Sequence, residues 1–120
     1  MQSFTDNTIN LTFLETFTGN DVTRIRKYVS MFLDSAPSEM DAIRKGMREK
    51  NWDALRAGAH SLKPQMVYMG IKEGEELLKT IELHAGNATH LEQLPSLVED
   101  LEKIFAKACE ELNAYLQLTK

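Results

Sequence analysis

Three polar residues at helical spacing form the part of this sequence that is best suited to chemistry. Arg56 lies four residues before His60, and Lys63 lies three residues after it, so one helix face can carry all three side chains. An imidazole titrates near neutral pH and can act as a nucleophile, a base or a metal ligand. Taken alone, however, the three residues are better explained as solvated polar groups on a helix.

A second group of candidates surrounds a turn. His84 and His90 flank Gly86-Asn87, and Glu82 lies close by in the sequence. These residues could approach a metal ion, but their spacing matches no established ligand pattern, and histidines beside a surface loop explain them better. A metal-binding or enzymatic bundle that uses them is kept as an alternative, although the sequence has no phosphate-binding glycine loop, HExxH or GxSxG motif. The prediction is therefore no metal site.

Composition limits the class of protein. The chain has 120 residues, 42% of them apolar, with only 6 Gly and 3 Pro, which indicates one folded domain over residues 1–120. The formal charge is -4 and no basic stripe is present, so no nucleic-acid partner is expected. The single cysteine, Cys109, excludes an internal disulfide and a thiolate zinc cage, and it is predicted to pack in the core.

Targeting and membrane signals are missing from the sequence. The first twenty residues have neither a basic start nor an apolar run, and apolar stretches elsewhere are only a few residues long. We therefore expect no membrane association and a cytoplasmic location. The same pattern fits a free-standing protein, weakly favoured, or a domain of a larger cytoplasmic protein.

Helical periodicity continues from end to end and predicts the elements that must position His60. It indicates an all-α fold, an antiparallel four-helix bundle with an additional N-terminal helical segment. Ser35-Ala36-Pro37 predicts a break between two helices, with Pro37 in the first turn of the second. The expected helical segments are 11–17, 22–35, 37–50, 52–69, 71–85 and 94–115.

The segment 52–69 carries a seam typical of a bundle helix. Its apolar residues repeat at spacings of four and three: Leu55, Ala59, Leu62, Met66 and Met69. Successive residues of an α-helix are turned by about 100°. His60 is therefore predicted to point away from the centre of the core, on a rigid element.

The segment AHSLKPQMVYMGI, residues 59–71, resembles the signature of histidine-containing phosphotransfer (HPt) domains of bacterial multistep phosphorelays. His60, Leu62, Lys63 and Gly70 match it, and the resemblance extends over residues 11–116, including the approach FLDSAPSEMDAIRKGMREKNWDALRAGAHSLK. The glycine that commonly follows the lysine is Pro64 here. Because proline lacks an N–H and crowds the carbonyl four residues earlier, we predict a mild kink and a released His60 carbonyl.

The resemblance implies a phosphorelay intermediate. His60 would accept a phosphoryl group from a phospho-aspartate of one receiver domain and pass it to an aspartate of another. The partners would be receiver domains of response regulators and hybrid sensor histidine kinases, and they would bring Mg²⁺ and most catalytic groups. The chain itself would be a monomeric carrier without a cofactor, not an enzyme, and Lys63 would stabilise charge on the phosphoryl oxygens.

Further contacts follow from helical spacing and from the expected antiparallel neighbour. Arg56 is a weaker phosphate or partner contact, and Lys79 and Glu82 are candidates to approach the other imidazole nitrogen. The apolar surface for docking is predicted around Pro64 and Val67, with Met40 or Arg44 from the preceding helix. The alternative function is a structural or adaptor bundle without phosphotransfer.

Overall fold

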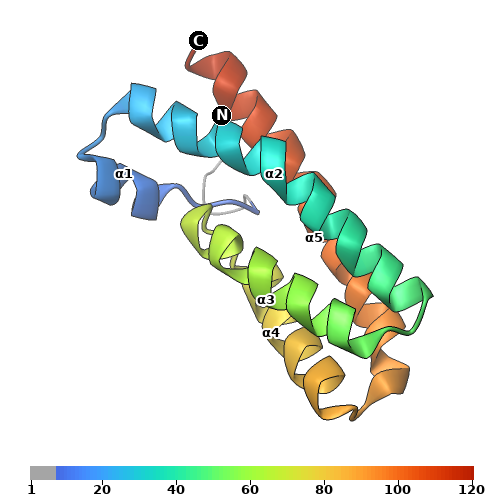
Figure 1. The fold of residues 1–120 in the computed structure, drawn as a ribbon. Coiled ribbons are helices and arrows are strands. Elements are labelled where there is room, and N and C mark those ends of the chain that lie inside the picture. The colour runs from blue at the N-terminus through green and yellow to red at the C-terminus, as the bar shows by residue number, and fades with distance from the viewer. Residues whose placement is uncertain (1–7) are drawn as a thin grey trace.

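Four long helices form an antiparallel bundle in the computed structural model, which describes residues 8–120 (Figure 1). A short helix precedes the bundle, and a 3₁₀ turn leads into its last helix. The predicted all-α bundle with an extra N-terminal helical segment is thereby confirmed. The elements are α1 (Thr12–Thr18), α2 (Val22–Arg48), α3 (Trp52–Tyr68), α4 (Lys72–Asn87), η2 (Leu91–Gln93) and α5 (Leu94–Leu118).

Local signals in the sequence account for most helix ends. The side chain of Asp21 accepts a hydrogen bond from the Arg24 N–H at 3.2 Å, and Asn51 caps α3 in the same way. Gly19 ends α1 in the left-handed conformation, with φ of 66°. The end of α4 differs from the prediction, because Gly86 and Asn87 lie inside the helix and Ala88 takes the left-handed conformation instead.

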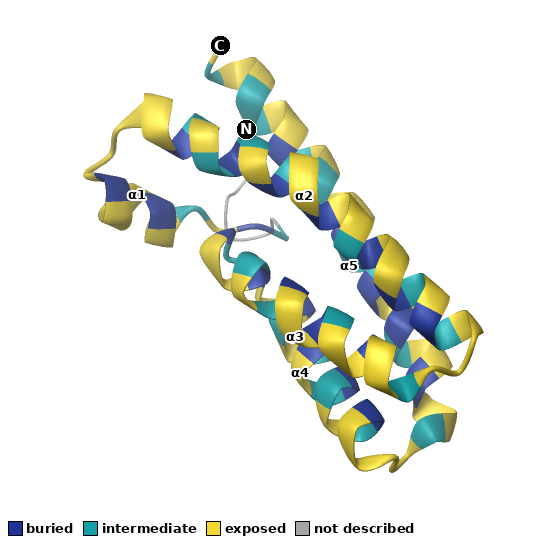
Figure 2. Cartoon of the chain, viewed as in Figure 1, coloured by how far each residue is buried: buried dark blue, intermediate teal, exposed yellow. Residues whose placement is uncertain are grey.

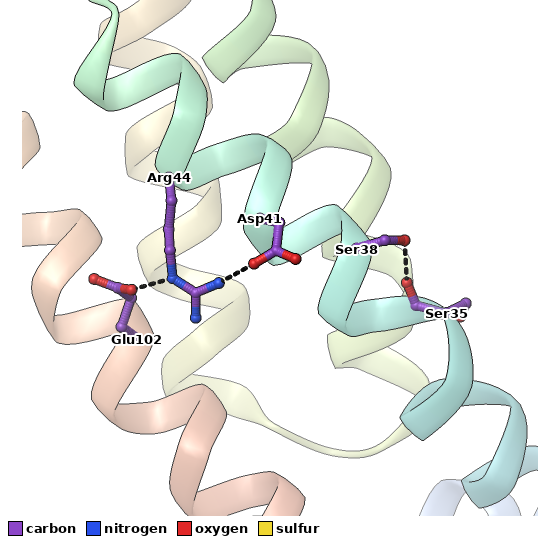
Figure 3. Close-up of polar contacts among 5 residues, drawn as sticks. All are labelled: Ser35, Ser38, Asp41, Arg44 and Glu102. Atoms are coloured by element: carbon purple, nitrogen blue, oxygen red, sulfur yellow. Dashed lines mark hydrogen bonds and ion pairs between the residues drawn. The ribbon is translucent and has the colours of Figure 1, made fainter.

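The predicted break at Ser35-Ala36-Pro37 is wrong, because α2 continues through Pro37 as one helix of 27 residues. Ala36 and Met40 are fully buried on either side of Pro37, so core packing holds the helix together at the point where one backbone hydrogen bond is lost. Ser38 also donates to the Ser35 carbonyl at 3.1 Å (Figure 3). Tertiary packing overrides the local helix-breaking signal here.

Buried residues form one stripe along the inner side of each helix (Figure 2). The predicted seam of α3 is confirmed, since Leu55, Ala59, Leu62 and Met66 are all fully buried. Cys109 is half-buried and packs against this core. Near the N-terminus, Phe17 and Val22 are exposed.

Residues 8–10, which precede α1, contact the C-terminal parts of α3 and α5. The N–H groups of Thr8 and Ile9 donate to the carboxylate of Glu111 on α5 at 3.1 and 3.0 Å. Asn10 N–H donates to the Met69 carbonyl at 3.1 Å, directly beside Gly70. These contacts fix the direction in which α1 enters the fold.

Arg44 joins α2 to α5. Its guanidinium pairs with Asp41 at 2.5 Å and with Glu102 of α5 (Figure 3). This residue therefore faces α5 and not the helix that carries His60. In the described part of the chain, no helix is long and apolar enough to cross a membrane.

Candidate functional site

His60 lies on the outer side of α3, between the flanks that face α2 and α4. Its neighbour Ala59 is fully buried in the seam, whereas the His60 side chain is 70% exposed. The predicted orientation away from the core is therefore confirmed. A helix of 17 residues therefore presents this imidazole to solvent.

Glu82 of α4 connects the two predicted active residues of α3. Its Oε2 lies 2.7 Å from Nδ1 of His60, and its Oε1 accepts from Lys63 Nζ at 2.7 Å. An ionised carboxylate can only accept hydrogen bonds, so this contact places the imidazole proton on Nδ1. In the neutral ring, Nε2 is then the nitrogen without a proton. The structure thus brings His60, Lys63 and Glu82 together, as the sequence predicted.

The neighbours of Glu82 stabilise the negative charge of its carboxylate. The hydrogen bond from Lys63 has the largest influence and lowers the pKa of Glu82, and the contact with His60 acts in the same direction. Partial burial opposes them, but the net pKa remains below the ordinary glutamate value. Glu82 is therefore ionised at neutral pH, with an acceptor oxygen directed at each of its two neighbours.

A second carboxylate lies on the opposite flank of α3. Glu39 of α2 accepts from the Ser61 hydroxyl at 2.9 Å and from the Gln65 side-chain amide at 2.6 Å. Gln65 Oε1 also accepts from Ser35 at 3.2 Å. Glu39 could not be predicted from sequence spacing, because its contacts depend on the packing of α2 against α3. Its only sequence signal is a polar residue next to the core residue Met40.

The remaining predicted site residues divide into three groups. Arg56 and Lys79 lie with Lys63 and Glu82 around a hollow between α3 and α4. Pro64 and Val67 are exposed on the same side of α3 as His60, one and two turns further along the helix. Met40 is fully buried, so its prediction as a docking residue is wrong.

Pro64 does not interrupt α3, which runs from Trp52 to Tyr68 as one helix. Proline has no N–H to donate, so this residue cannot bind the His60 carbonyl in the helical pattern. The angle of the predicted kink stays a prediction. The structure establishes that the helix continues for four residues beyond Pro64.

An apolar groove lies between α1, α2 and α3, and no pattern in the sequence predicted it. It has a volume of about 450 Å³, and exposed Phe13, Phe17, Met31 and Tyr68 form much of its wall. The Phe13 ring lies 5.9 Å from that of Phe17 and 5.5 Å from that of Tyr68. Tyr68 is half exposed at this wall.

The alternative site at His84 and His90 is a stacked pair of rings, with centroids 4.9 Å apart. The Nδ1 atom of His84 is buried and has no hydrogen-bond partner among residues 8–120. Over residues 8–120, no group of three or more His, Cys, Asp or Glu side chains is placed to hold a metal ion. Burial raises the pKa of the Cys109 thiol, which disfavours a reactive thiolate there.

The bundle and the site together define a class of protein. An exposed imidazole on a central bundle helix, oriented by a carboxylate and accompanied by a lysine, is typical of a helical phosphoryl carrier. The Hpt domain model matches residues 27–117, and the chain belongs to this family. It therefore has a phosphotransfer role in a phosphorelay.

A solved structure has the same fold. It is the HPT domain from the Hpt sensor hybrid histidine kinase of Shewanella, with a TM-score of 0.81 and 20% sequence identity. The alignment covers 92% of this chain and 95% of that one. No curated protein matches the sequence.

Proposed function

We propose that His60 is the phosphoryl acceptor of this domain and that the group is carried on Nε2. The single observation that carries this proposal is the contact of 2.7 Å between His60 Nδ1 and the Glu82 carboxylate. It holds the proton on Nδ1 and leaves the lone pair on Nε2 of an exposed ring. A nucleophile of this kind needs no further base.

The transfer step is a displacement at phosphorus. The Nε2 lone pair forms the N–P bond while the bond from phosphorus to the donor aspartate oxygen breaks, and the aspartate leaves as a carboxylate. Attack by a neutral imidazole places positive charge on the ring, and Nδ1 keeps its proton. The Glu82 carboxylate stabilises that charge, so it favours the phosphorylated state as well as the correct tautomer.

Lys63 is proposed to exchange its binding partner during transfer, from the Glu82 carboxylate to the phosphoryl group on His60. In the free protein its ammonium binds Glu82 at 2.7 Å, one helical turn from His60. A phosphoryl group on Nε2 adds oxygens that an ammonium can bind. Lys63 therefore neutralises Glu82 before transfer and contacts the phosphoryl oxygens after it.

The partner is proposed to be a receiver domain of a response regulator or a hybrid sensor histidine kinase. It would supply the aspartate, the Mg²⁺ ion and most catalytic groups, so this chain acts as a carrier without a cofactor of its own and not as an enzyme. The apolar groove begins on the helix that carries His60, since Gln65 and Tyr68 line it. An apolar surface of the receiver docked there would bring the aspartate over the imidazole.

The test is transfer of label from a ³²P-phosphorylated receiver domain. Wild-type protein should acquire acid-labile, alkali-stable label, the behaviour of a phosphohistidine, and His60→Gln should acquire none. His84→Gln and His90→Gln are the matched controls and should be labelled normally. Label that persists in His60→Gln, or its absence from the wild type with every receiver tried, would contradict the proposal.

A further inference from the structure

A basic hollow lies between α3 and α4, beside the acceptor histidine. Its volume is about 530 Å³. Three of the side chains around it are cations and one is an anion, although the whole chain has a net charge of -4. The lining residues used below are Arg56, Lys63, Lys79, Glu82 and Gly86.

Gly86 makes room for Arg56 in this hollow. A Cβ atom on Gly86 would lie 2.8 Å from Cδ of Arg56 and 3.6 Å from its Cγ, so the stem of the arginine lies directly on the backbone of α4. A larger residue at position 86 would push this stem away. The absence of a side chain at position 86 therefore leaves space for the Arg56 stem to pack against α4 beside the hollow.

Two of the three cations are not neutralised by a salt bridge within residues 8–120 and can bind an anionic partner. The Lys63 ammonium and the Glu82 carboxylate neutralise each other at 2.7 Å. Over residues 8–120, neither Arg56 nor Lys79 forms a salt bridge. The hollow thus presents two unneutralised positive charges next to His60.

We infer that this hollow receives the acidic rim of the receiver's active site, with Arg56 and Lys79 bound to its carboxylates. This inference rests on the proposed function of His60. A receiver that binds Mg²⁺ beside its aspartate must gather several carboxylates, because Mg²⁺ prefers carboxylate and water oxygens. Those carboxylates meet the positive flank of α3, while the apolar groove lies on the flank toward α2. The two flanks together give the receiver one orientation on α3.

Charges at the rim of an interface act mainly on association and on its salt dependence. We therefore expect the double variant Arg56→Gln/Lys79→Gln to bind a receiver about tenfold more weakly at low salt and to lose much of the salt dependence. The rate of transfer within the bound complex is measured separately, so that weaker association is distinguished from a slower reaction.

The experiment uses a panel of purified receiver domains with Mg²⁺ and beryllofluoride. Affinity is measured by fluorescence anisotropy at several salt concentrations, and transfer is measured separately by single turnover at saturating receiver. Lys45→Gln/Lys107→Gln is the control with the same change of net charge away from the hollow, and it should bind normally. Gly86→Ala, which leaves the charge unchanged, should weaken binding in the same direction as loss of Arg56.

Equal affinity and equal salt dependence of the double variant and the wild type overturn the inference, as does a control variant weakened to the same degree. Absence of binding to every receiver of the panel overturns it too. Loss of labelling at His60 is a separate result, because it contradicts the proposed function whatever the binding data give. Normal His60 labelling with an unaffected double variant leaves the acceptor assignment in place and removes only the docking role of the hollow.

Discussion

Nδ1 of His60 and Oε2 of Glu82 lie 2.7 Å apart across the interface of two helices, although 22 residues separate them in the chain. The tautomer of the His60 imidazole therefore depends on how α4 packs against α3. A small shift between these helices would break the contact without unfolding either of them. The carrier's chemistry and its bundle packing are coupled through this one carboxylate.

Removal of that carboxylate should slow phosphoryl acceptance. We expect Glu82→Ala to lower the single-turnover rate from a phosphorylated receiver by a few-fold to about tenfold, because a charged hydrogen bond is lost at a mostly exposed site. Glu82→Gln keeps an acceptor oxygen without the charge, so its rate should be intermediate. Glu76→Ala, at an exposed position of the same helix, is the control. An unchanged rate in Glu82→Ala would show that the contact does not position His60.

Acid should weaken the fold partly through Glu82. Its pKa is lowered in the folded state by Lys63 and His60, so its stabilising effect is complete above the ordinary glutamate pKa of about 4.3 and is lost as the pH falls through the lowered value. Because the pair is close to solvent, the effect should stay below about 1 kcal/mol. Urea unfolding of wild type and Glu82→Gln from pH 7 to pH 3 checks it. The difference in unfolding free energy should shrink below pH 4, and a difference that grows there would be the wrong sign.

Replacement of Pro64 should stabilise the protein. Pro64→Ala restores an N–H that can donate to the His60 carbonyl in the interior of α3, and we expect the unfolding free energy to rise by about 1–2 kcal/mol after the smaller entropy of the unfolded proline chain is subtracted. Pro95→Ala is the matched control. Pro95 lies in the first turn of α5, where an N–H has no acceptor within the helix, so proline loses no hydrogen bond there. Equal effects of the two substitutions would mean that Pro64 costs α3 nothing.

Gly70 and Gly19 form a matched pair for the N-terminal segment. Both have positive φ, 63° and 66°, but a Cβ on Gly70 would lie 1.9 Å from the Asn10 carbonyl oxygen, whereas nothing lies within 4 Å at Gly19. Gly19→Ala should cost about 1 kcal/mol, the backbone strain alone. Gly70→Ala should cost more than about 2 kcal/mol and expose the Asn10 amide to rapid hydrogen exchange. Comparable losses would indicate that residues 8–11 move aside freely.

The sequence predicted the bundle because its helices repeat apolar residues at three and four positions and carry local caps. The prediction failed where tertiary packing opposed a local signal. Pro37 lies between two fully buried residues of α2, and no local rule weighs their packing against one lost hydrogen bond. Periodicity also does not reveal which part of an apolar helix face lacks a neighbour, and Phe17 and Tyr68 are exposed in the structure.

The candidate site was predictable to the extent that it lies on one helix. His60, Lys63 and Arg56 share α3, so their spacing alone places them together. Glu82 was found by counting along an antiparallel neighbour, which is a coarse guide to a single side chain. Glu39 and the contact of Arg56 with Gly86 depend on the rotation of α2 and α4 about their axes, and no spacing rule supplies that.

The four bundle helices differ in length, and this difference affects where local unfolding occurs most easily. α2 has 27 residues and α3 has 17, a difference of about 15 Å, so α2 and α5 extend beyond the other two helices at the end that α1 covers (Figure 1). Backbone amides at that end have fewer packed layers over them and should exchange with solvent at a lower opening free energy than those at the α2–α3 turn. A receiver seated in the apolar groove would close this end, so slowed amide exchange there would report docking independently of phosphoryl chemistry.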